Sequence, residues 1–140
     1  FGALHNTALQ LGIAYPKVAP RQDEYVDVLA RTKALTESWG GKLYLLYIPA
    51  RGRYVGIFNR DFVYDQVRSQ VVAAAAKNNV PLIDLATLFR GMSNPDEFYG
   101  SEDSHFSESG AKVAAEAVLE KVSAKSDRMA DARPRPAPHP

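Results

Sequence analysis

The chain has 140 residues, 46% of them hydrophobic and 24% charged, which is typical of one globular domain with a real core. Seventeen basic residues against sixteen acidic residues give a formal net charge of +1, so bulk charge gives no argument for nucleic acid or an anionic membrane as a partner. The absence of cysteine excludes disulfides, thiolate metal sites and a cysteine nucleophile, and no apolar run is long enough to span a membrane.

The first half of the chain predicts one helix followed by one strand. Apolar residues recur at helical spacing over residues 23–39, and Gly40-Gly41 ends the pattern as helix-terminating glycines do. Residues 42–48 then form a nearly continuous apolar run that Pro49 stops. Such a run is typical of a strand covered on both faces, as in a parallel sheet.

The second half predicts a helix over residues 62–77, a strand over 80–85, a helical turn at 87–89 and a last helix over 107–123. This alternation predicts an α/β fold, in which the two strands are parallel neighbours and helices cover both faces of the sheet. Two strands are few for a free-standing sheet. The chain also starts at Phe1 rather than at Met. We therefore expect a processed piece that lacks sheet at its N-terminal side, so that self-association is expected.

The end of the chain differs from the rest. Residues 124–140 are polar, basic and rich in proline and arginine, with four prolines among the last seven residues. Such a segment cannot bury enough surface to order itself. We expect a domain over residues 1–123 and a disordered tail over 124–140.

One short stretch combines an acid, an imidazole and a helix start. Asp103 and His105 are two residues apart, so their side chains leave an extended segment on the same side. Ser107 suits the N-cap of the following helix, and Glu108 places negative charge in its first turn. A histidine held in this way beside a carboxylate can act as a general base. The alternative is an ordinary capped loop with a surface histidine.

Further candidates come from the carboxyl ends of the strands, where ligands bind in open α/β sheets. Arg51 and Arg53 follow the first strand and could clamp a carboxylate or sugar, or stabilise developing negative charge. The alternative, a solvated basic loop, is the more frequent case. Asp84 ends the second strand and is expected to cap the next helical turn. Asp65, on the helix between the strands, is expected to face water.

A nucleophile is missing from this set. The sequence contains neither Gly-x-Ser-x-Gly nor Gly-Asp-Ser, and Gly91-Met92-Ser93 lies in a polar segment far from a strand end. The three histidines are too scattered for a metal site. We predict no metal and no cofactor.

The stretch from Asp103 to Gly110, followed by Val113-Ala114, resembles the last sequence block of the SGNH/GDSL hydrolase superfamily. In that block an Asp shortly precedes a His, and a small polar residue and a Gly open the final helix. The two predicted strands resemble its later core strands, and the resemblance covers roughly residues 23–122. It implies a flavodoxin-like SGNH architecture, of which this chain would be the C-terminal portion.

The resemblance implies that His105 is the catalytic base and Asp103 the acid that orients it. The family's commoner spacing, Asp-x-x-His, would instead select Glu102, so both acids remain candidates. The implied activity is ester hydrolysis or O-acyl transfer on a small-molecule or carbohydrate acyl ester, through a Ser–His–Asp type site whose serine is not in this chain. Such a protein could be bacterial and periplasmic or otherwise extracytoplasmic. The competing hypothesis is a non-catalytic α/β binding or interaction module.

Overall fold

The computed structural model describes residues 7, 22–55, 61–100 and 105–131. The helices among them are α2 (Gln22–Ser38), α3 (Asp61–Lys77), α4 (Leu85–Arg90) and α5 (Glu108–Asp131). The strands are β1 (Leu45–Tyr47) and β2 (Leu82–Asp84), and two short 3-10 helices are η1 (Arg51–Arg53) and η2 (Pro95–Phe98).

The two strands form a parallel pair, as the sequence predicted. Leu45 pairs with Leu82, and Tyr47 pairs with Asp84. Helix α3 makes the crossover between the strands. The regular strands are shorter than the apolar runs that predicted them. Of the run 42–48, only three residues form the β-ladder, and Ile48 is already half exposed.

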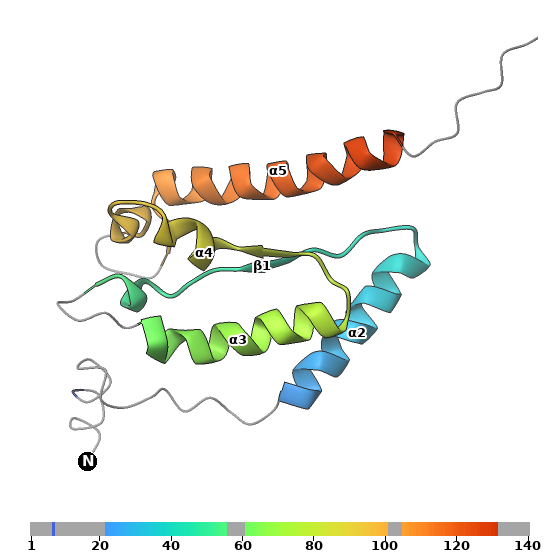
Figure 1. The fold of residues 1–140 in the computed structure, drawn as a ribbon, viewed down its shortest axis with the longest axis horizontal. Coiled ribbons are helices and arrows are strands. Elements are labelled where there is room, and N and C mark those ends of the chain that lie inside the picture. The colour runs from blue at the N-terminus through green and yellow to red at the C-terminus, as the bar shows by residue number, and fades with distance from the viewer. Residues whose placement is uncertain (1–6, 8–21, 56–60, 101–104, 132–140) are drawn as a thin grey trace, which may run out of the picture.

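Helices lie on both faces of this pair, so the predicted α/β architecture is confirmed. Figure 1 shows the strands between α5 on one side and α3 on the other. On the α3 side, α2 packs against α3, and the buried residues are Val26, Leu29, Ala74 and Val80. On the α5 side, the core residues come from β2, α4, the end of η2 and α5, and they are Ile83, Leu85, Phe89, Tyr99 and Ala114.

Helix α2 buries a narrower face than its sequence pattern indicated. Val26 and Leu29 are buried against α3, but Val28, Leu35 and Trp39 of the predicted stripe remain 60–70% exposed. The helix ends at Ser38, and the expected terminating glycine Gly40 follows with a φ of 81°, which glycine adopts without strain. The periodicity therefore predicted the helix correctly, but not the extent of its cover.

Helix α5 extends farther than the sequence predicted. It begins at Glu108 and runs to Asp131, past the expected boundary between domain and tail at 124, while residues 132–140 lie outside the described part. Val122 of this helix is 39% exposed. An apolar groove of about 610 Å³ runs between α5 and β1, lined by Leu46, Ala114, Ala115, Val118, Leu119 and Val122. The predicted self-association remains a prediction.

Candidate active site

His105 lies in the short segment between η2 and α5 and is exposed to solvent. The backbone on either side of it is paired with the end of η2. The Gly100 N–H donates to the His105 carbonyl oxygen at 2.8 Å, and the next residue, Phe106, forms an antiparallel bridge with Tyr99. The position of the His105 backbone is therefore set by hydrogen bonds.

Helix α5 starts directly after this segment, with Ser107 as its cap. The Gly110 N–H donates to Ser107 Oγ at 3.3 Å, and the Ala111 N–H donates to the Ser107 carbonyl oxygen at 2.9 Å. This confirms the predicted cap. Gly110 is buried against η2 so closely that a Cβ would overlap the Phe98 carbonyl oxygen. A glycine is required here by this close approach of the backbone.

Tyr99 connects the His105 segment with the sheet. Its hydroxyl donates to the carbonyl oxygen of Pro49, the second residue after β1, at 2.5 Å. Its ring packs against Phe106, with centroids 5.3 Å apart. Burial raises the pKa of the Tyr99 hydroxyl, so it stays protonated and can donate. His105 is thereby tied to the carboxyl edge of the strands, where the start of α5 also lies in Figure 1.

Both candidate acids, Asp103 and Glu102, lie outside the described residues. The expected bond between Asp103 and the His105 ring therefore stays a prediction.

Arg53 is buried and paired, unlike the solvated loop arginine that was the more frequent alternative. It lies in η1, and its side chain is only 1% exposed. Its guanidinium donates to Asp65 Oδ1 at 2.8 Å and lies 5.7 Å from the ring centroid of Tyr64. Burial raises the pKa of Tyr47, on β1, and the Arg53 guanidinium opposes this effect. Arg51, at the other end of η1, is partly exposed.

Asp84 caps α4, as predicted, and it also pairs with α3. Its Oδ1 accepts from the backbone N–H groups of Ala86 and Thr87 at 3.1 and 3.4 Å. Its Oδ2 accepts from Arg68 Nε at 2.7 Å. Burial alone would raise the pKa of Asp84, but the hydrogen bonds from Arg68 and Thr87 lower it below its ordinary value. This carboxylate therefore remains charged near neutral pH.

Sequence reasoning missed the residues that join these groups. Asp65, expected to face water, is partly buried and lies 2.8, 3.5 and 3.9 Å from the guanidinium groups of Arg53, Arg90 and Arg68. The spacing of Asp65 and Arg68, three residues apart on one helix, was the available signal. Ion pairs connect Arg53 to Asp84 through Asp65 and Arg68. His105 takes no part in these ion pairs; its segment is linked to the carboxyl edge of the sheet by the Tyr99 hydrogen bond.

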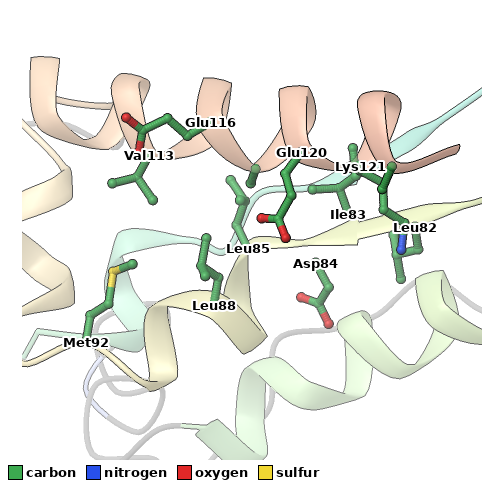
Figure 2. A pocket seen from close by; sticks show the side chains of 12 residues that line it. Leu82, Ile83, Asp84, Leu85, Leu88, Met92, Val113, Glu116, Glu120 and Lys121 are labelled. Carbon is green, nitrogen blue, oxygen red and sulfur yellow. The ribbon is translucent and has the colours of Figure 1, made fainter. Parts of the chain in front are cut away.

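A groove of about 520 Å³ lies between α5 and the β2–α4 junction (Figure 2). Leu85, Leu88 and Met92 supply part of its apolar lining, and Glu120 of α5 points toward it. Asp84 leaves β2 on the side away from α5 in Figure 2, toward Arg68 of α3. His105 is not among the residues that line this groove. The groove is therefore distinct from the His105 segment.

Two further findings concern metals and membranes. Within the described ranges, no group of three or more His, Asp or Glu side chains is gathered closely enough to hold a metal ion. In the same part of the chain, no helix combines the length and the apolar character needed to cross a bilayer.

Comparison with known families supports the resemblance that the sequence suggested. A family model described as "SGNH hydrolase-like domain, acetyltransferase AlgX" matches residues 13–137, a range that contains His105 and every helix and strand named above. Comparisons with curated proteins and with solved structures found no match. At the level of the family, the chemistry is acyl transfer or hydrolysis. The chain belongs to the SGNH hydrolase-like domain family of the acetyltransferase AlgX.

Proposed function

We propose that this chain supplies the histidine base of a Ser–His–Asp type site that hydrolyses acyl esters or transfers an O-acyl group, with small-molecule or carbohydrate acyl esters as the substrate class. The observation that carries the proposal is the placement of His105. It is exposed, it immediately precedes α5, and its segment is tied to the carboxyl edge of a parallel sheet. Ligands bind at this edge in open α/β sheets.

In the proposed reaction, His105 accepts the proton of a serine hydroxyl as that oxygen attacks the acyl carbonyl. Collapse of the tetrahedral intermediate leaves an acyl-enzyme, and the departing alcohol takes the proton from His105. Water or an acceptor hydroxyl then gives its proton to His105 and attacks the acyl-enzyme, and His105 returns that proton to the departing serine oxygen. Asp103 is proposed to orient the ring. Because the 140 residues contain no Gly-Asp-Ser or Gly-x-Ser-x-Gly motif, the serine is proposed to come from another segment.

The loop after β1 is proposed to face the substrate. Within this proposal Arg51, which is partly exposed, makes the direct contact with a carboxylate or sugar hydroxyl. Arg53 contributes to substrate binding by fixing η1, because its buried guanidinium is already paired with Asp65. A paired arginine holds its loop more rigidly than a solvated one does.

The test is hydrolysis of 4-nitrophenyl acetate by the protein as its gene encodes it. General base catalysis contributes about 10²- to 10⁴-fold to a rate, so we expect His105→Ala to lower kcat/KM by roughly 10³-fold. Asp103→Ala should also cause a large loss, whereas Glu102→Ala should retain most of the activity. Asp103 and Glu102 are neighbours of like charge, so each variant is the control for the other.

Two outcomes would contradict the proposal. Activity that survives His105→Ala would remove His105 from the chemistry. A wild-type protein that releases no 4-nitrophenol would favour the alternative, a non-catalytic α/β binding module. If Glu102→Ala inactivates and Asp103→Ala does not, the site stands but its orienting acid is Glu102.

A further inference from the structure

The end of η2 with the two residues after it (97–100) is hydrogen-bonded to the His105 segment and the first residues of α5 (105–110), and we call these two stretches together the clasp. Its backbone is closed by two hydrogen bonds, from the Gly100 N–H to the His105 carbonyl oxygen at 2.8 Å and from the Ser107 N–H to the Phe98 carbonyl oxygen at 2.9 Å. Ser107 Oγ also donates to the Glu97 carbonyl oxygen at 2.9 Å. These hydrogen bonds tie the two stretches of the clasp together, so a contact that fixes residues 97–100 also fixes the backbone of His105.

Tyr99 links the clasp by a hydrogen bond to the segment that follows β1. It is 5% exposed, and its ring meets Phe89 edge-on with centroids 6.3 Å apart. Its hydroxyl donates to the Pro49 carbonyl oxygen across 50 residues of sequence. Pro49 is itself fully buried, so the hydrogen bond joins two buried groups at the end of β1. Such a bond is costly to break, because its carbonyl acceptor would be left without its donor in the interior.

We propose that Tyr99 is a positioning residue for the reaction, because its hydroxyl fixes the distance of His105 from the carboxyl end of β1. The inference rests on the proposed function. A base must lie within hydrogen-bond reach of the proton it takes, and a displacement of about 1 Å can cost roughly 10²-fold in rate. The ring of Tyr99 fills the core, while its hydroxyl sets the position.

A purely packing role for Tyr99 makes a different prediction. Tyr99→Phe keeps the ring and its contacts with Phe89 and Phe106 and removes only the hydroxyl. If packing were the whole role, this change would leave the clasp and the reaction as they are. Tyr44→Phe is the matched control, because Tyr44 is a partly buried tyrosine packed against the same core cluster.

The first measurement is amide hydrogen exchange at Gly100 and Ser107, whose N–H groups close the clasp. Loss of one hydrogen bond lowers stability by about 1 kcal/mol, and about 1.4 kcal/mol corresponds to a tenfold change in an equilibrium constant, here that of local opening. We expect Tyr99→Phe to accelerate exchange at both amides by roughly 5- to 10-fold. The Leu45 amide, which bonds to Pro81 in the sheet, should change less, and Tyr44→Phe should accelerate neither clasp amide.

The second measurement is the steady-state hydrolysis of 4-nitrophenyl acetate by the same variants and by His105→Ala. A misplaced base should lower kcat by about 10- to 100-fold and leave KM unchanged, since the substrate contacts are intact. Unchanged exchange and unchanged kcat in Tyr99→Phe would overturn the inference. Loss with His105→Ala but not with Tyr99→Phe overturns the positioning role alone, whereas activity retained by His105→Ala overturns the proposed function itself.

Discussion

Replacing Asp84 by alanine would test how the carboxyl edge of the sheet is held together. One carboxylate ends β2, caps α4 and pairs with Arg68 of α3. The Arg68 and Asp84 side chains are only 21% and 14% exposed, so this is not a solvent-screened surface pair. The substitution removes the cap and the ion pair together.

The two losses can be estimated separately. Replacing an N-cap aspartate by alanine costs about 1 kcal/mol, and a hydrogen bond to a charged group contributes about 1.5–3 kcal/mol. Asp65 stays 3.9 Å from Arg68, so the guanidinium keeps a weaker partner and the lower end of that range applies. We expect the free energy of unfolding to fall by about 2.5 kcal/mol. For a domain of this size, that corresponds to a decrease in Tm of roughly 10 °C.

The direction of the Asp84 pKa shift determines how the stability lost in Asp84→Ala depends on pH. Burial acts to raise the pKa of Asp84, but the hydrogen bonds from Arg68 and Thr87 hold it below the ordinary value. A carboxylate with a lowered pKa contributes stability that is complete above its unfolded pKa of about 4 and is lost as the pH falls through the folded value. The difference in Tm between wild type and Asp84→Ala should therefore be full at pH 7 and shrink below about pH 4.

The assay is thermal unfolding followed by circular dichroism at pH 7 and pH 3. Asp27→Ala is the control, because Asp27 is exposed on α2 and surface changes usually stay within about 0.5 kcal/mol. Equal Tm values for the Asp84→Ala and Asp27→Ala proteins at pH 7 would refute the reasoning. A difference that grows toward pH 3 would contradict the direction of the pKa shift.

Two other variants test the close approach at α5 and the buried ion pair. Gly110→Ala should lower the free energy of unfolding by at least about 2 kcal/mol, because its Cβ would overlap a backbone carbonyl of η2. Gly91→Ala is the control, since its Cβ would make an ordinary contact at 3.6 Å. Equal urea midpoints for the two variants would show that α5 does not lie so close to η2. Arg53→Met should cost about 2 kcal/mol, because its side chain is 1% exposed and bonded to Asp65. Arg90→Met, half exposed and 3.5 Å from the same carboxylate, should cost less than about 1 kcal/mol, and the reverse order in urea unfolding would contradict the structure.

The order of elements could be predicted from sequence because it depends on local patterns. The continuous apolar runs before Pro49 and before Asp84 indicated strands buried on both faces, and the helical period between them indicated a crossover. Parallel pairing then followed from the handedness and connection rules. The local signals Gly40 and Ser107 also placed one helix end and one helix start correctly.

The contacts between elements could not be predicted in the same way. Arg53 and Asp65 are 12 residues apart, and nothing in their neighbours indicates that η1 folds back onto α3. Tyr99 lies 50 residues from Pro49, so the tie between clasp and sheet appears only once the tertiary structure is known. The helical periodicity over residues 23–39 marks an apolar face but does not tell how much of that face another element covers, so the exposure of Trp39 could not be predicted from it.

The parallel ladder also has a consequence for the folding rate. Leu45 pairs with Leu82, and both η1 and α3 lie between these two residues in the sequence. Closing so long a loop costs conformational entropy before any strand contact is formed. The ion pairs Arg53–Asp65 and Arg68–Asp84 span only 12 and 16 residues. We expect them to form around α3 first and to shorten the loop that the strands must close, so that their removal slows refolding as well as weakening the native state.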